Sequence, residues 1–337
     1  MMKKIKKYTA IIIAAIAAFS CVIFASCENN ENKKEKLSVV CTIFPEYDWV
    51  KELSGGENAN IDLKLLLDSG ADLHNYQPTV ADLATIYACD LFIYVGGESD
   101  EWVTAALKNA TNKNMKTINL LQVLGEKVKD EEHIDGMQPE KGGTDVDDSD
   151  HNHGEHEHEK DEHVWLSVKN AAVICEKIAA ELAVIDSENA SVYAENLVKY
   201  TQKLNALDDE FLNVVNAAKH KTFVFGDRFP FRYLADDYGI NYFAAFSGCS
   251  AESEASFETI VFLSEKIDEL SLPAVCKIEG SSQKIAEQIK QNTKNKNQKI
   301  IAFDSLQSVT ASDLKSGKNY ISAMQNNLTA LKQALGA

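Results

Sequence analysis

The sequence predicts an α/β protein of two lobes, each with a largely parallel sheet, joined by one long rigid helix. Three observations predict it. β-favouring apolar runs alternate with helical patterns along most of the chain, one helical pattern in the middle is much longer than the others, and a single acidic, histidine-rich segment interrupts the alternation. In open sheets of this kind ligands bind beyond the carboxyl ends of the strands, so residues that follow predicted strands are the first candidates for a site.

The first lobe is predicted to span residues 37–186. Its strands are the β-favouring runs at residues 37–44, 61–67 and 91–95, and helical patterns or turns follow each of them. Pro45 opens the first helical pattern and Gly55-Gly56 closes it. Residues 168–182 form a further predicted helix at the end of this lobe. Strands alternating with helices in this way favour parallel pairing.

The linker helix is predicted within residues 187–220, and the second lobe within residues 221–337. Apolar side chains recur at steps of three to four residues through the linker: Val192, Tyr193, Leu197, Tyr200, Leu204, Leu207, Phe211 and Val215. At about 1.5 Å per residue the helix is long enough to bridge two lobes. Strands of the second lobe are predicted at residues 222–225, 242–246, 274–278 and 300–303.

The N-terminus has the layout of a secretory signal. Four lysines precede an uncharged apolar run, which ends in small residues immediately before Cys27. Residues 1–26 are therefore predicted to be a lipoprotein signal peptide, Cys27 the lipidated residue, and residues 27–36 a flexible tether. The alternative is an uncleaved membrane helix, because the apolar run is near the lower length limit for a span. Both interpretations place the fold outside the cytoplasm, at the outer face of the membrane or in a periplasm.

Composition limits the classes of partner. The chain has 337 residues, 45% of them hydrophobic, and a formal net charge of -17, which becomes -21 when the four lysines of the signal are removed. Such an acid excess argues against nucleic acid as a partner and leaves room for cations. The seven cysteines have no CxxC spacing, so they predict neither a zinc knuckle nor a disulfide framework. Cys249, in the segment SGCS, is expected to be a small buried residue and not a ligand.

The segment 131–162 is predicted to be an exposed loop, because it lacks apolar periodicity. Residues 145–163 contain nine acids and five histidines. Neutral imidazoles suit zinc, copper and nickel, so His151, His153, His156 and His158 are interpreted as a metal-collecting loop. The alternative is a solvated acidic loop whose histidines are incidental. The HExxH spacing of zinc proteases is missing from the segment.

Two further histidines lie at the ends of predicted elements. His74 follows a predicted strand and a turn at Gly70, and His163 lies between the acidic loop and a predicted helix. Each alone is ambiguous, since a single histidine is often a hydrogen-bonded structural residue. His74 and His163 are candidate ligands when they are considered together.

These segments resemble a known family, the metal-binding receptor proteins of bacterial zinc and manganese ABC importers. The resemblance covers nearly the whole chain after residue 37 and is carried by SVVCTIFPEYDWVKELSG, GADLHNYQPTVADLATIYACDLFIYVGGESDEWV, HVWLSVKNA and the stretch from RYLADDYGI to IAFDSLQSV. It implies two α/β lobes around a long helix, with the metal in the cleft between them. It also implies that His74, His163 and Asp304 are ligands.

The third ligand that the resemblance implies is not settled by the sequence. Counting back from Tyr233 places it on Arg228, which stays protonated and cannot bind a metal. Counting forward from Phe223 places it on Asp227 instead. Glu279, after a later strand, is a further candidate, and a site with only three protein ligands is the remaining alternative.

The resemblance implies a receptor that captures Zn²⁺, with Mn²⁺ as the alternative, and delivers it to a membrane permease driven by a cytoplasmic ATPase. We therefore expect no enzyme activity, no nucleic-acid partner and a monomer attached to the lipid membrane through Cys27. Histidine ligands and the histidine-rich loop favour zinc, whereas oxygen ligands favour manganese. A surface metal buffer or adhesin, and an exported zinc hydrolase, are the competing functions.

Overall fold

A computed structural model describes residues 36–56, 59–138, 159–250 and 254–337, and the chain from Leu37 onwards forms one compact unit. The N-terminal lobe contains a four-stranded sheet in the order β2-β1-β3-β4, and every pairing is parallel. Its strands are β1 Leu37–Cys41, β2 Ile61–Leu65, β3 Leu91–Tyr94 and β4 Lys116–Asn119. The central strands β1 and β3 are almost entirely buried, as expected for a parallel sheet covered on both faces.

The C-terminal lobe repeats this architecture with a second parallel sheet in the order β6-β5-β7-β8. Its strands are β5 Thr222–Arg228, β6 Asn241–Phe246, β7 Ala274–Ile278 and β8 Lys299–Phe303. The register changes near the end of β5, where Arg228 pairs with Phe246 of β6. This irregularity re-aims the side chains at the carboxyl end of β5.

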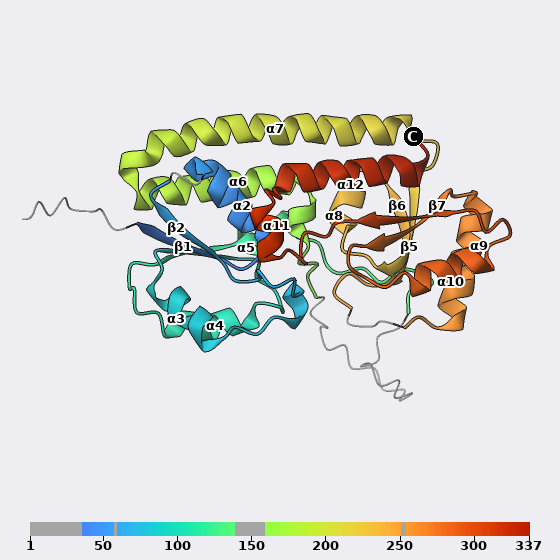
Figure 1. Cartoon of the computed structure of the whole chain (residues 1–337), viewed down its shortest axis with the longest axis horizontal. Helices are drawn as coiled ribbons and strands as arrows, with labels where there is room; N and C mark the ends of the chain where they lie inside the picture. Colours follow the sequence, from blue (N-terminus) through green and yellow to red (C-terminus); the bar gives the residue numbers. More distant parts are fainter. Residues whose placement is uncertain (1–35, 57–58, 139–158, 251–253) are drawn as a thin grey trace, which may run out of the picture. The chain divides into compact units, whose positions relative to one another are not determined.

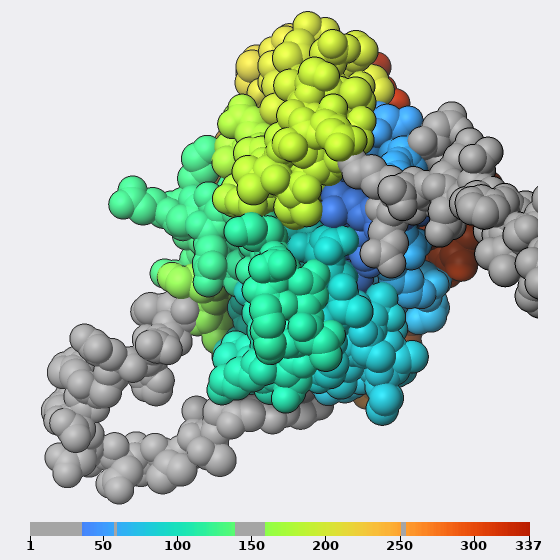
Figure 2. Space-filling model, turned by 90° about the vertical axis from the view of Figure 1, so that its left-hand side faces the viewer, coloured from blue at the N-terminus to red at the C-terminus, as the bar shows by residue number. Residues whose placement is uncertain are grey.

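Helices connect the strands and cover both sheets (Figure 1). The helices of the N-terminal lobe are α2 Phe44–Ser54, α3 Val80–Ala88, α4 Glu101–Lys108, α5 Leu120–Leu124 and α6 Val168–Ile185. Those of the C-terminal lobe are α8 Arg232–Tyr238, α9 Phe257–Leu270, α10 Lys284–Asn292, α11 Ala311–Lys315 and α12 Tyr320–Leu335. In Figure 2, the yellow-green surface around the α6–α7 connection lies above the cyan-to-green surface of α3, α4 and their neighbours.

The long helix α7 Ala190–Ala217 links the two lobes. Six side chains bury its inner face at the predicted spacing: Tyr193, Tyr200, Leu204, Leu207, Phe211 and Val215. It packs against α2 and α6 of the first lobe, against α8 of the second and against α12. One apolar core therefore continues from β1 and β3 through these helices to β5 and β8.

The predicted fold class is confirmed, while several element boundaries differ. β4 was not predicted, because its sequence KTIN is short and polar and most of its side chains are partly or fully exposed. The predicted strand 37–44 ends at Cys41, since Phe44 already begins α2. There the buried Glu46 carboxylate accepts hydrogen bonds from the backbone N–H of Thr42 and of Ile43, at 2.9 and 3.2 Å. The predicted linker helix begins at Ala190, after a short 3-10 helix, Ser187–Asn189.

Several predictions concern residues outside the described ranges. They are the signal peptide at 1–26, the lipidation of Cys27, most of the tether at 27–36 and the histidines of the metal-collecting loop, His151, His153, His156 and His158. No helix within the described ranges combines the length and apolar character that a membrane span requires.

Candidate metal centre

His74 lies in the loop after β2, within the 3-10 helix η2, Leu73–Asn75. Asp72 begins that helix, and its Oδ1 accepts a hydrogen bond from the backbone N–H of His74 at 3.1 Å. The Nδ1 atom of the His74 ring lies 2.8 Å from Oγ of Ser99, in the loop after β3. The backbone N–H and Nδ1 of His74 are thus both engaged, and Nε2 is the ring nitrogen that remains to face a ligand.

His163 is fully buried and lies immediately before the 3-10 helix η4, Val164–Leu166. Oδ1 of Asp161 lies 2.9 Å from the backbone nitrogen of His163 and 3.0 Å from its Nδ1. Contacts from the second lobe hold η4 itself: Nε1 of Trp165 donates to the carbonyl of Ser305, and the Tyr320 hydroxyl donates to the carbonyl of Trp165. The imidazole therefore has a fixed orientation.

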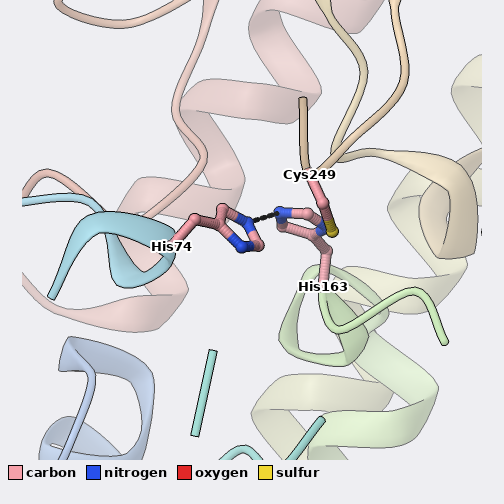
Figure 3. A group of neighbouring side chains, drawn as sticks. All are labelled: His74, His163 and Cys249. Carbon is pink, nitrogen blue, oxygen red and sulfur yellow. Dashed lines mark hydrogen bonds between the residues drawn. The ribbon is translucent and has the colours of Figure 1, made fainter. Parts of the chain in front are cut away.

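The two rings approach each other through their Nε2 atoms, which lie 3.2 Å apart (Figure 3). When Nδ1 carries the ring proton, as its partners on both residues allow, Nε2 presents a lone pair to a metal. Burial and then the neighbouring His163 lower the pKa of His74 to about 3, so that this imidazole is neutral at physiological pH. Two donors on one tetrahedral zinc ion are about 3.3 Å apart, so the observed separation fits a shared ion.

Cys249 completes this group, although sequence analysis did not select it as a site residue. Among the described residues, the ligand atoms of His74, His163 and Cys249 form a cluster in which all lie within 4.8 Å of one another. Cys249 follows β6 and approaches the rings from the second lobe (Figure 3). Its backbone N–H donates to Oε1 of Glu131 at 2.8 Å, and burial raises the pKa of its thiol.

A pocket of about 340 Å³ opens beside this cluster and has an acidic lining. Its walls include His74, Cys249 and four glutamates, Glu98, Glu131, Glu159 and Glu162. The side chain of Glu162 is only 2% exposed, and burial raises the pKa of its carboxyl group. Such a lining concentrates cations near the imidazoles.

Glu162 reaches this position because Gly97 has no side chain. Oε1 of Glu162 accepts a hydrogen bond from the backbone N–H of Ser99 at 3.0 Å. A Cβ atom at Gly97 would lie 2.2 Å from Oε1, and the φ of +78° at Gly97 also favours glycine. Oε2 of Glu162 lies 3.7 Å from Nδ1 of His74 and has no hydrogen-bond partner within the described residues.

The predicted third-ligand position has another role. Arg228 forms an ion pair with Asp72, the residue that begins η2. Gln307, when its amide nitrogen faces Asp72, donates to both carboxylate oxygens at 2.8 and 2.9 Å, and its oxygen then lies 2.9 Å from Nε2 of His163. Arg228 thus holds the loop that carries His74, and Gln307, which sequence analysis did not select, touches both His163 and that loop.

The structure places Asp227 and Glu279 beside a second cavity, of about 480 Å³, that Arg228 and Asp72 also line. Oδ2 of Asp227 accepts from the Ser281 hydroxyl and from the backbone N–H of Ile278. Glu279 accepts from the backbone N–H and the hydroxyl of Ser305, each at 2.7 Å. Their side chains are not among those brought together with the two imidazoles, so a metal role for either would require these bonds to break.

Asp304 is likewise occupied by partners from its own lobe. Its Oδ2 lies 2.7 Å from Nζ of Lys318, and its Oδ1 accepts from the backbone N–H of Leu306 at 2.9 Å. Within the described residues, Asp304 is outside the cluster that His74 and His163 form. A metal role for Asp304 would require these contacts to break.

The donor set suits a divalent transition metal. Two imidazole nitrogens at a separation appropriate for one ion, with a thiol and a carboxylate close by, are ligand types that zinc accepts. Hard cations such as Mg²⁺ and Ca²⁺ need more oxygen ligands than this cluster offers.

Comparisons with known proteins agree with this chemistry. The chain is 33% identical over 322 residues to the zinc-binding lipoprotein AdcA of Streptococcus pneumoniae, covering 95% of this chain and 60% of that protein. It thus spans only about three fifths of that relative. It is 28% identical over 336 residues to the high-affinity zinc uptake system protein ZnuA of Bacillus subtilis, covering 98% of both.

Among solved structures, the Zn(II)-bound ZnuA-like domain of Streptococcus pneumoniae AdcA matches with a TM-score of 0.68 and 28% identity. The match covers 90% of this chain and 100% of that one. Residues 39–334 also match the family model described as zinc-uptake complex component A, periplasmic (ZnuA). The chain therefore belongs to the ZnuA family of zinc-uptake complex components.

Proposed function

We propose that this chain is the extracytoplasmic receptor of an ABC importer, which captures Zn²⁺ and delivers it to a membrane permease coupled to a cytoplasmic ATPase. In this proposal the protein is a monomer anchored to the outer face of the membrane through Cys27. It is a binding protein and not an enzyme. Zinc is its cargo, so the site must bind the ion tightly and still release it.

One observation carries the proposal: Nε2 of His74 and Nε2 of His163 converge at 3.2 Å while a partner engages each Nδ1. An imidazole orients its lone pair toward a metal when its far nitrogen is held as a donor. Because the pKa of His74 is about 3, its ring is already neutral near pH 7 and can bind zinc without first losing a proton. His74 and His163 are therefore the proposed zinc ligands.

The acidic segment fits the same function. Asp130 pairs with Lys160 in a β-bridge, and the backbone N–H of Glu131 donates to the carbonyl of Glu159 at 2.7 Å. Glu131 and Glu159 both line the pocket beside His74, so both ends of the segment reach the candidate site. We propose that His151, His153, His156 and His158, which lie outside the described residues, collect zinc near this pocket.

Calorimetric zinc titration of the purified protein tests the proposal. His74→Ala and His163→Ala should each lower zinc affinity by more than the ~10–100-fold that the loss of an outer-sphere partner costs. His220→Ala is the matched control, because His220 lies before β5, beside Gly336 at the end of α12. Zinc affinity unchanged in both site variants would contradict the proposal.

Growth in chelated medium separates an importer component from a passive buffer or adhesin. A strain that lacks this protein but retains the permease should require added zinc, and the wild-type chain should restore growth. Restoration by the His163→Ala chain as well would argue against zinc delivery. Normal growth of the deletion strain would favour the buffer.

A further inference from the structure

The two imidazoles supply only two of the four ligands of a tetrahedral metal. Both come from the N-terminal lobe, so the groups that the C-terminal lobe brings to them decide what the site prefers to bind. Zinc in proteins usually has three or four ligands from nitrogen, sulfur and oxygen. The C-terminal lobe offers several candidates, which differ in whether their donor atoms are free.

The end of β5 does not supply a free donor. Arg228 is a permanent cation and is paired with Asp72. Asp227 accepts from the Ser281 hydroxyl and from the backbone of β7. For Asp227 to bind the metal, its hydrogen bonds to Ser281 and to the backbone of β7 would have to break.

The loop after the neighbouring strand brings a donor close to both imidazoles. Arg228 of β5 is paired in register with Phe246 of β6, and Cys249 comes three residues after Phe246. The loop after β6 therefore begins beside the end of β5 and carries Sγ to within 4.8 Å of a ring nitrogen of each histidine. Tetrahedral zinc with bonds of about 2.05 Å to nitrogen and about 2.3 Å to sulfur separates such donors by about 3.6 Å.

Backbone contacts fix the loop in this place. The N–H of Cys249 donates to Oε1 of Glu131. A Cβ atom at Gly248 would lie 3.1 Å from the Phe229 carbonyl oxygen and 3.3 Å from the His163 ring, so glycine favours this close approach. The segment is thus packed directly against a proposed ligand.

A second observation indicates that a cation belongs here. Glu162 lines the same pocket as His74 and Cys249, its side chain is 2% exposed, and its Oε2 has no hydrogen-bond partner within the described residues. A buried carboxylate oxygen without a partner is costly unless a positive charge compensates it. A divalent ion between the two histidines and the cysteine would provide that charge.

We propose that Cys249 is the third protein ligand of the captured ion, and that its thiolate makes the site selective for Zn²⁺ over Mn²⁺. The inference rests on the proposed function and specifies the chemistry of the same site. As the Sγ–Zn bond forms, the S–H bond breaks and its proton passes to solvent, because a metal-bound thiol is deprotonated. Thiolate is a soft ligand that zinc accepts readily, whereas manganese favours oxygen.

Cobalt substitution tests the sulfur bond directly in the unaltered protein. Co²⁺ bound to a thiolate shows an intense near-ultraviolet charge-transfer absorption, which is missing when all ligands are nitrogen or oxygen. We expect this absorption in the Co²⁺-loaded wild-type protein and its loss in Cys249→Ser. Cys276→Ala is the matched control, since Cys276 is a buried cysteine in the middle of β7. A wild-type spectrum without the absorption would overturn the proposal.

Competition between metals tests selectivity. Cys249→Ser should lower zinc affinity by at least about tenfold. Cys249→Asp should shift the ratio of zinc to manganese affinity at least about tenfold toward manganese, because a hard oxygen replaces sulfur. Thermal unfolding of the metal-free variants checks that they are folded. Unchanged affinities for both metals in both variants would contradict the role of Cys249.

The outcomes separate this inference from the proposed function. If the wild-type protein binds zinc tightly, and His74→Ala weakens binding while Cys249→Ser does not, the receptor function stands and the thiolate ligand is wrong. If the wild-type protein does not bind zinc, both proposals fail.

Discussion

In the N-terminal lobe, Asp161 and Ser99 contact the far nitrogens of His163 and His74, and the near nitrogens lie 3.2 Å apart, with the Gln307 amide oxygen 2.9 Å from that of His163. In the C-terminal lobe, Asp227, Glu279 and Asp304 are occupied by serine hydroxyls, backbone N–H groups and Lys318. The difference shows that proximity and residue type do not by themselves make a ligand. What matters is also which partners the donor atom already has and how close it lies to the other donors.

The largest expected effect concerns a buried acid in the N-terminal lobe. Burial, together with the charge of Asp100, raises the pKa of Glu46 from 4.5 to about 8, and its Oε1 has no partner within the described residues. Because the folded state favours the protonated form, its contribution to stability is complete below pH 4.5 and is lost as the pH rises through about 8. The free energy of unfolding should therefore fall by roughly 4 kcal/mol from this group between pH 5 and 9.

Urea unfolding of the wild-type protein and of Glu46→Gln at these two pH values measures the effect. The variant should lose much less stability between them. Glu279→Gln is the comparison in the second lobe, where burial raises the pKa to about 7 and Ser305 contacts both carboxylate oxygens. Equal pH dependence in the wild-type and Glu46→Gln proteins would show that Glu46 is not the cause.

The next effect concerns the orientation of His163. Asp161→Asn replaces a charged acceptor with an amide that holds the ring less strongly, so zinc affinity should fall about 10–100-fold while the fold is retained. Asp227→Asn is the matched control, being the same change in the other lobe. Equal losses of zinc affinity in Asp161→Asn and Asp227→Asn would contradict the claim that only the N-terminal carboxylate positions a ligand.

Ser99→Ala removes the hydroxyl that lies 2.8 Å from Nδ1 of His74. We expect a loss of about tenfold in zinc affinity, because Glu162 remains near the same nitrogen. Competition against a chromophoric chelator would measure it. An increase in affinity would mean that this hydrogen bond opposes metal binding.

The smallest effects are expected for the C-terminal carboxylates. Asp227→Asn, Glu279→Gln and Asp304→Asn should each change the free energy of zinc binding by less than ~0.5 kcal/mol, about a factor of two in affinity. The same chelator competition applies to all three. A tenfold loss in any one of them would identify that residue as a ligand and would contradict the comparison above.

Strand and helix alternation predicted the fold, since buried parallel strands and the long α7 produce strong local patterns. β4 is an edge strand that pairs only with β3. Its side chains can therefore be polar, and its sequence shows no apolar run. The end of β1 was predicted three residues too late, since the bonds that fix the turn into α2 come from the Glu46 side chain and not from an apolar repeat.

The candidate site was predictable only in part. His74 and His163 lie next to predicted elements, in two of the segments that carry the family resemblance. Cys249 has no local signal beyond a short SGCS turn after a strand, and its approach to His74, 175 residues away in the chain, depends on how the two lobes pack. The contacts of Asp227 with Ser281, of Glu279 with Ser305 and of Asp304 with Lys318 could not be predicted from the sequence, because they join residues far apart in the chain.

The lobes are connected by more than one helix. α12 follows the second sheet, yet it packs on α2 of the first lobe as well as on α7, β5, β7 and β8. At the amino end of α12, the backbone N–H of Tyr320 donates to Oδ2 of Asp48 in α2 at 2.8 Å. Two crossing helices resist bending far better than a single hinge does. We therefore expect the distance between the two lobes at the candidate site to change little, so that an ion that binds there meets a site of nearly fixed width.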